Sequence, residues 1–289
     1  MALPPDLTEL ANTYPLPSNA TFKGGITKFL NYTKGLLGAT GNAPEARVAL
    51  GIGNAISNRN LLDNATFRVN QRNQAGTVTL AAGSYGHDRW KAGAAGCTYT
   101  FAASGNDFVI TITAGSLIQI VEALNVEGGT YSMTWTGTSQ GKIGAGAFAA
   151  SGVSQASVPA NANLSVEFGT GTLSKVQLEV GAPTPFERKH LATDTLNCQR
   201  YFWQGQPFLG VNFYAAVSGA HFTLSIQWPA EMRAAPTAGT SGSVTASGVT
   251  GVAVSGGTKR GANMFMQSNT TGNVNFSIGT LQVFASAEL

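Results

Sequence analysis

The chain has 289 residues, of which 11% are charged, and its formal net charge is +3. Charged residues make up about a quarter of a typical soluble domain, so hydroxyl, amide and small apolar groups must cover most of this surface. The lysines and arginines form no cluster along the sequence, which argues against nucleic-acid binding, because phosphate binding needs several cations on one face. No apolar run approaches the ~18 residues that cross a bilayer, so we expect no membrane insertion.

The first residues and the two cysteines indicate where the protein is made. Residues 1–6, Met-Ala-Leu-Pro-Pro-Asp, lack the basic and apolar regions of a secretory signal. Cys97 and Cys198 are too few for a disulfide framework and have no metal-ligand spacing, so we expect two buried free thiols. We therefore expect synthesis in a cytoplasm, with release by cell lysis if the protein acts outside the cell.

Residues 1–57 are predicted to form a helical segment. Apolar residues at helical spacing predict one short amphipathic helix within residues 21–37, although three glycines weaken it. A second short helix is predicted over residues 44–50, where Pro44 suits the first turn and Gly51 ends the pattern. Helices shorter than ~12 residues are not stable alone. We therefore expect identical copies of the chain to bury these helices in a trimer.

Residues 58–187 are predicted to form a β-sandwich, because short alternating runs are separated by Gly, Ser and Asn turns. The expected strands are residues 77–80, 108–113, 116–123, 130–136, 164–168 and 173–180. The segment that opens at Asn60 and the strand that closes at Val180 are expected to lie side by side. Pro183 and Pro185 end the last strand.

Residues 188–289 also contain short alternating runs and are predicted to form a second β domain, joined to the sandwich by a short link. The expected strands are residues 201–203, 211–217, 221–228, 274–278 and 281–285. Residues 237–257 are rich in Gly, Ser, Thr, Ala and Val, and the pattern does not decide between short strands and a loop. The fold class predicted for the whole chain is therefore mainly β.

Several short segments resemble proteins of bacteriophage and prophage tail fibres. Residues 175–188, Lys-Val-Gln-Leu-Glu-Val-Gly-Ala-Pro-Thr-Pro-Phe-Glu-Arg, are followed by Cys-Gln-Arg-Tyr-Phe at 198–202, and this seam is similar to one found in many tail fibres. Residues 46–55 resemble an element that recurs along fibre shafts, and the ending Ala-Ser-Ala-Glu-Leu resembles fibre tips. Residues 60–67 and 173–179 resemble the terminal strands of jelly-roll carbohydrate-binding modules.

The resemblance implies a role in the virion tail. It implies a homotrimeric fibre whose N-terminal segment docks to tail or baseplate proteins. The jelly-roll middle domain would be a spacer or an accessory binding module. The C-terminal domain would bind a receptor on the bacterial surface, such as a glycan. Three weak sites on one trimer tip raise avidity. Assembly would occur in the host cytoplasm, and lysis would release the particle.

No catalytic residue is predicted. Glycoside hydrolysis needs two carboxyl groups that face each other, whereas Glu122 and Glu127 flank a loop, and Glu167 and Glu179 are expected to face solvent from their strands. The scattered histidines suggest neither a triad nor a metal pair: they are His87, His190 and His221. Two alternatives to a binding protein remain open, a polysaccharide-degrading hydrolase or lyase and a purely structural tail or baseplate component.

Sugar binding is the function for which candidate residues can be named, because aromatic rings offer apolar faces and amides can bond hydroxyl groups. The candidate receptor-binding or glycan-binding residues are Trp203, Gln204, Gln206, Phe208, Tyr214, Tyr85 and Trp90. Residues 203–208 are the first choice, because they suggest a loop with exposed rings.

A structural calcium ion is an additional possibility that the jelly-roll resemblance raises. Asp63, Asn64 and Glu179 could supply its oxygen ligands. Ordinary hydrogen bonding at strand ends is the alternative that we prefer, and we expect no other cofactor.

Overall fold

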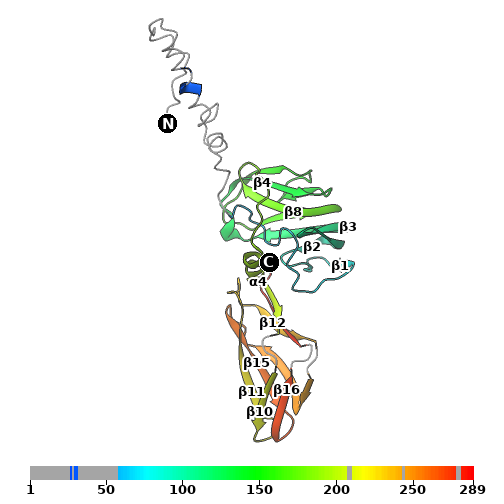
Figure 1. Cartoon of the computed structure of the whole chain (residues 1–289), viewed down its shortest axis with the longest axis vertical. Helices are drawn as coiled ribbons and strands as arrows, with labels where there is room; N and C mark the ends of the chain where they lie inside the picture. Colours follow the sequence, from blue (N-terminus) through cyan, green and yellow to red (C-terminus); the bar gives the residue numbers. More distant parts are fainter. Residues whose placement is uncertain (1–26, 28, 32–57, 207–209, 243–244, 278–280) are drawn as a thin grey trace. The chain divides into compact units, whose positions relative to one another are not determined.

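The computed structural model describes residues 27, 29–31, 58–206, 210–242, 245–277 and 281–289. Contacts between residues divide the chain into two units, Met1–Ser57 and Asn58–Leu289. In the first unit Thr27 and residues 29–31 are helical, within the helix expected over residues 21–37. The helix expected over residues 44–50 lies outside the described residues. The second unit is mainly β, and its sheets are antiparallel (Figure 1).

The first part of the second unit is an eight-stranded antiparallel sheet, with the strand order β1-β2-β3-β8-β4-β6 and with β7 joining β3 to β5. Its strands are β1 (Val78–Leu80), β2 (Lys91–Ser104), β3 (Asp107–Val121), β4 (Gly129–Thr136), β5 (Gly141–Ile143), β6 (Val153–Val158), β7 (Leu164–Phe168) and β8 (Gly171–Val180). A short 3-10 helix, η1 (Ala123–Asn125), follows β3. The sheet thus branches at β3, which pairs with β7 near one end and with β8 nearer the other.

Two strands that the sequence predicts separately, over residues 108–113 and 116–123, form the single strand β3. Gly115 lies at the join with a φ of +71°, and a Cβ there would come within 2.0 Å of the carbonyl oxygen of Gly96. The register between β2 and β3 shifts at this place, between Ala92 and Cys97. Glycine therefore permits a bulge in a continuous strand rather than ending it.

The core lies between the two branches of the sheet. Trp135 of β4 and Phe168 of β7 meet edge to face, with ring centroids 5.1 Å apart. Trp90, directly before β2, is also within this core and has no exposed surface. The opening segment lies along the closing strand as expected, because the backbone N–H of Leu61 donates to the carbonyl oxygen of Leu178 (2.9 Å).

The second part begins with a helix, α4 (Leu191–Gln199), where the sequence suggests only a link. Three three-stranded sheets follow, ordered β10-β16-β13, β11-β15-β14 and β12-β17-β9. Their strands are β9 (Phe202–Gly205), β10 (Gly210–Ala215), β11 (His221–Gln227), β12 (Thr237–Ser241), β13 (Thr245–Ser247), β14 (Val249–Ser255), β15 (Gly261–Ser268), β16 (Gly272–Ser277) and β17 (Gln282–Ser286). The undecided residues 237–257 are thus mostly strands.

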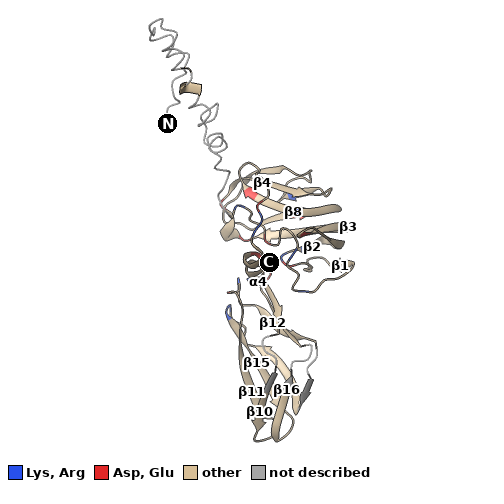
Figure 2. Ribbon diagram, viewed as in Figure 1, with Lys and Arg blue, Asp and Glu red and all other residues tan. Residues whose placement is uncertain are grey.

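The strands β9 to β17 contain no Asp, Glu, Lys or Arg, as their colour in Figure 2 shows. Their core is apolar and includes Trp203 and Trp228, whose ring centroids are 5.5 Å apart. In the part of the chain that the structure describes, no helix has the length and apolar character needed to cross a membrane.

Candidate functional site

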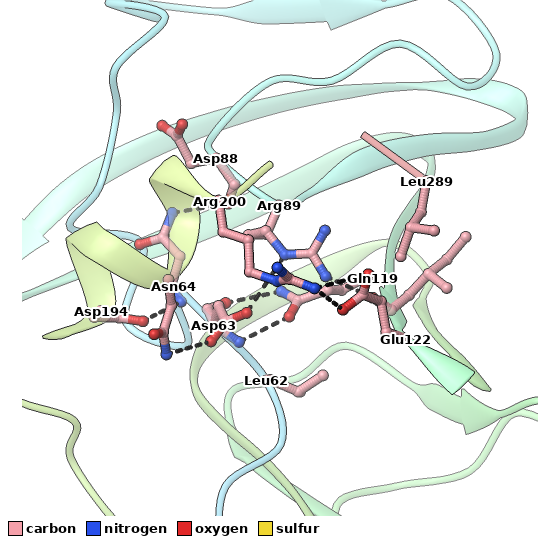
Figure 3. Close-up of polar contacts among 12 residues, drawn as sticks. Leu62, Asp63, Asn64, Asp88, Arg89, Gln119, Glu122, Asp194, Arg200 and Leu289 are labelled. Carbon is pink, nitrogen blue, oxygen red and sulfur yellow. Dashed lines mark hydrogen bonds and ion pairs between the residues drawn. The ribbon is translucent and has the colours of Figure 1, made fainter. Parts of the chain in front are cut away.

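Charged side chains join the eight-stranded sheet to the residues after it, and we call them the junction cluster. The cluster consists of Asp63, Arg72, Arg89, Glu122, Lys189, Arg200, Arg233 and Glu288. Ion pairs in it connect residues before position 187 with residues after it, at the expected boundary between the two β domains. Figure 3 shows part of this cluster around Asp63 and Arg89.

Arg89 lies at the centre of the junction cluster and is 3% exposed. One terminal nitrogen donates to the carbonyl oxygen of Ile120 (2.7 Å), and the other lies 3.4 Å from a carboxylate oxygen of Glu288. Its Nε is 3.5 Å from Asp63, and its guanidinium carbon lies 3.3 Å from the ring centroid of Tyr201. One buried cation therefore contacts the sheet, the second residue after α4 and the segment after β17.

Asp63 is a second centre of the junction cluster. Its carboxylate accepts hydrogen bonds from Lys189 (2.9 Å) and Asn197 (3.0 Å), and its backbone N–H donates to the Gln119 side chain (2.8 Å; Figure 3 shows Asp63 beside Gln119). Burial alone would raise the pKa of Asp63, but the positive charges of Lys189 and Arg89 outweigh it and hold the pKa below its usual value. The carboxylate is therefore charged at neutral pH.

Two further carboxylates complete the junction cluster. Glu122 lies 3.1 Å from Arg200 and 3.8 Å from Arg233, and Glu288 lies 2.9 Å from Arg72. Burial raises the pKa of Glu288, although Arg72 and Arg89 oppose that effect. Truncating one member of a buried ion pair leaves its partner uncompensated, which costs more than the pair contributes when complete.

The segment 175–188, which resembles a tail-fibre seam, forms structural contacts with the residues that open the first part. Glu179 of β8 accepts hydrogen bonds from the backbone N–H and the hydroxyl of Thr184 (both 2.7 Å) and pairs with Arg59 (2.8 Å). Glu187 accepts from the backbone N–H groups of Asn58 (2.6 Å) and Arg59 (2.7 Å). The expectation that Glu179 faces solvent is therefore wrong: the chain after β8 folds back and covers it, leaving 1% of the residue exposed.

A polar pocket of about 360 Å³ opens beside the junction cluster. Asp63, Lys189 and Arg200 line it together with Thr193 and Asn197 of α4. The pocket combines two cations, one carboxylate and several neutral polar groups. Of the aromatic residues proposed for sugar binding that the structure describes, none lines it.

Most of the predicted sugar-binding residues have structural contacts. Trp90 is in the core without exposed surface, and Trp203 is 9% exposed and packs on Trp228. Gln204 donates to the side chain of Gln282, and the hydroxyl of Tyr85 donates to the carbonyl oxygen of Leu289. The two tryptophan rings are therefore not available for stacking, and the Gln204 amide and the Tyr85 hydroxyl both bond within the chain.

Three predicted residues remain. Gln206 is exposed, whereas Phe208 lies outside the described residues. Tyr214 of β10 is 67% exposed. Of the predicted aromatic residues that the structure describes, Tyr214 has the most accessible ring.

Tyr214 belongs to a polar sheet face that sequence reasoning missed. Asn273 of β16 lies directly opposite Tyr214, and Asn212 lies opposite Asn275 two pairs further along, beyond the pair of Phe213 and Val274. Residues opposite one another share a sheet face, and all three asparagines are exposed. We call these four residues the Tyr214 face. The signal was present as Asn-Phe-Tyr and Asn-Val-Asn, in which the polar residues alternate with Phe213 and Val274.

The three candidate calcium ligands do not form one site. Asp63 and Glu179 bond to different cations, and the side chain of Asn64 donates to the carbonyl oxygens of Val69 (2.7 Å) and Asp88 (3.0 Å). Among the residues that the structure describes, no three His, Cys, Asp or Glu side chains are grouped so that they could hold a metal ion. The side chains of these three residues thus form hydrogen bonds or ion pairs with other groups of the chain.

The cysteines are buried and free, as predicted. Burial raises the pKa of Cys97 to about 11, and it raises that of Cys198 well above its usual value. Both are therefore thiols at neutral pH, and neither has the thiolate character of a nucleophile.

His87 is expected to make the protein acid-sensitive. The imidazole is 1% exposed, its Nδ1 lies 2.9 Å from the hydroxyl of Tyr99, and burial lowers its pKa to about 4 from the ordinary 6.5. Between these two values the unfolded chain binds a proton that the folded chain does not, so stability falls as the pH falls from 6.5 to 4. The shift corresponds to about 3 kcal/mol.

Urea unfolding at a series of pH values tests this expectation. The free energy of unfolding should fall by about 3 kcal/mol more in the wild type than in His87→Asn between pH 7 and pH 4. His221→Asn, at an exposed position, should keep the wild-type dependence. Parallel curves for the wild type and His87→Asn would contradict the assignment.

No protein-family model matches this chain, and no curated protein or solved structure matches it either. The fold and the described residues define a class, that of mainly-β proteins with antiparallel sheets.

Proposed function

We propose that the chain is a non-catalytic receptor-binding protein of a bacteriophage tail fibre, which attaches the virion to the bacterial surface. Residues 1–57 dock it to tail or baseplate proteins, residues 58–187 form a jelly-roll sandwich, and residues 188–289 form the tip. Three copies make the fibre. The protein is assembled in the host cytoplasm and reaches the outside by lysis.

The segment resemblance and the character of the C-terminal strands support this proposal. The strands β9 to β17 carry neither acidic nor basic residues. Such strands are suited to recognising neutral hydroxyl and amide groups, which cover glycan surfaces, and do not attract nucleic acid. The junction cluster would hold such a tip at a fixed orientation to the domain before it.

The observation that carries the proposal is the Tyr214 face. A tyrosine ring that is 67% exposed lies among three exposed asparagines on a regular sheet. Each asparagine amide offers two donors and one acceptor oxygen, and the ring offers an apolar face and a hydroxyl. This arrangement can contact both the faces and the hydroxyl groups of a sugar.

Exposed apolar residues support the trimer. Phe29 lies in a helical turn and is 65% exposed, although apolar faces of short helices require burial. Identical copies would cover it. Light scattering of the full chain at micromolar concentration should give the mass of three chains, and a folded monomer would contradict the trimer.

Replacing Tyr214 with alanine should weaken cell binding. Each of the three tips would lose its aromatic contact, and because avidity multiplies small losses, we expect roughly a tenfold or larger reduction. The measurement is binding of the fluorescently labelled full chain to host cells, together with its ability to block infection. Phe148→Ala is the matched control, since Phe148 is also an exposed aromatic residue (41%) but follows β5 in the other part.

The outcomes separate the proposal from its rivals. Equal binding by the wild type and Tyr214→Ala would contradict the Tyr214 face as the contact. Absence of cell binding by the wild type would favour a purely structural tail component. Release of oligosaccharides from host polysaccharide would overturn the non-catalytic assignment.

A further inference from the structure

We propose that the polar pocket beside α4 is a second binding site, which takes an acidic sugar residue of a saccharide. It is separate from the Tyr214 face and does not rest on the tail-fibre assignment. Four stretches of chain line it: the segment before β1, η1, the residues up to and within α4, and the residues directly after that helix. A volume of about 360 Å³ is within the usual range of small-ligand sites.

The walls of this pocket are already fixed without a ligand. Lys189 and Asn197 are both bonded to Asp63, at 2.9 and 3.0 Å. Arg200 is bonded to Glu122 at 3.1 Å. Side chains held in this way lose little conformational freedom when a ligand binds. The pocket is therefore preorganised rather than shaped by its occupant.

The charge of the lining favours an anion. Asp63 is the carboxylate in the lining, and two cations, Lys189 and Arg89, face its charge while the Asn197 amide donates a hydrogen bond to it. Lys189 has three N–H donors and Arg200 has five, so their bonds to carboxylates leave other donors for a ligand. The side chain of Arg200 is 38% exposed. A ligand carboxylate can therefore bond to these two cations without displacing a contact of the chain.

The neutral lining favours a hydroxylated ligand. Asn58, Asn125 and Thr193 line the pocket and are exposed. Within the described residues their side chains have no hydrogen-bond partner, so their amides and hydroxyl are available. Two amides and one hydroxyl beside two cations match a sugar ring that carries one carboxylate. A simple carboxylate would leave the neutral groups unused.

Titration calorimetry of the full chain with trigalacturonate tests the proposal. We expect saturable binding, and we expect neutral maltotriose and sodium acetate each to bind at least roughly tenfold more weakly. Thr193→Trp should fill the pocket and reduce trigalacturonate binding by roughly tenfold or more. Leu196→Trp is the matched control, because Leu196 is on the same helix, 48% exposed and outside the lining.

A second variant and a stability measurement keep the result interpretable. Lys189→Met should weaken trigalacturonate binding but leave maltotriose unaffected, and thermal unfolding establishes that each variant is folded. Tyr214→Ala should bind trigalacturonate like the wild type, which distinguishes failure of this site from failure of the proposed receptor contact. The proposal is overturned by no saturable binding, by equal binding of maltotriose or acetate, or by full binding in folded Thr193→Trp.

Discussion

Replacing Arg89 with methionine is expected to lower the free energy of unfolding by about 3–5 kcal/mol. Methionine keeps much of the apolar stem but removes the charge that Asp63 and Glu288 face, and it removes the donor to the carbonyl of Ile120. Each of these groups is then left less well compensated in a largely buried site, and the stacking on Tyr201 is lost as well. Urea unfolding followed by tryptophan fluorescence measures the effect.

The control for Arg89→Met is Arg260→Met. Arg260 also pairs with a carboxylate, that of Glu231 at 3.3 Å, but both side chains are largely exposed, 84% and 52%. Exposed pairs contribute little to stability, so this variant should unfold at the wild-type urea concentration. A similar small effect for both variants would show that the junction cluster does not hold the two parts together.

Replacing Asn64 with alanine is expected to cost about 3–5 kcal/mol of the free energy of unfolding. The residue has no exposed surface and a φ of +51°. Its side chain donates to the carbonyl oxygens of Val69 and Asp88 and accepts from the backbone N–H of Val69 (2.9 Å). Alanine leaves the carbonyl oxygens of Val69 and Asp88 and the N–H of Val69 without these hydrogen bonds in the interior. It also tolerates the left-handed backbone conformation less well.

The matched control for Asn64→Ala is Asn161→Ala. Asn161 has a similar φ of +55° but is exposed. Replacing Asn161 should therefore lower the free energy of unfolding only by the cost of placing alanine in a left-handed backbone conformation, about 1 kcal/mol. Thermal and urea unfolding of both variants separates the two contributions. If they lose equal stability, the side-chain hydrogen bonds of Asn64 contribute nothing.

The β-rich fold could be predicted because its larger strands alternate strongly. β7 carries Leu164, Val166 and Phe168 on its buried face, and the expected and observed bounds agree. β2 was missed, because its first half, Lys-Ala-Gly-Ala-Ala-Gly, has no large apolar side chains to alternate. Pairing with β3 on one side and β1 on the other forms it instead. β15 was missed for a related reason, since its buried residues are the small Ala262 and Ser268 around two methionines.

α4 could not be predicted from local sequence. Its nine residues include Thr, Asp and Asn, which form helices poorly. Only Asp194 and Cys198 are buried, so no apolar stripe marks a packed face. Asp194 accepts from the backbone N–H of Asn64 (2.8 Å) and so attaches the helix to a segment 130 positions earlier. Long-range contacts such as this one leave no periodic signal.

The candidate site could be predicted only in part. Aromatic residues were predicted to bind sugar, but a tryptophan in a strand can face either the core or the solvent, and Trp90 and Trp203 are both buried. Trp203 turned inward because Trp228 offers it a packing partner. The Tyr214 face depends on the register of β10 with β16, which are about 60 residues apart in the sequence. The sequence of one strand alone does not determine its register with a distant strand.

The absence of charge from the strands β9 to β17 has a consequence for how any binding by these strands would depend on salt. Attraction between charges weakens steeply as salt rises, because the Debye length falls from about 30 Å at 0.01 M to about 3 Å at 1 M. Contacts made by rings, amides and hydroxyls on neutral strands are not screened in this way. If the Tyr214 face binds a receptor as proposed, its affinity should therefore change little between low and high salt.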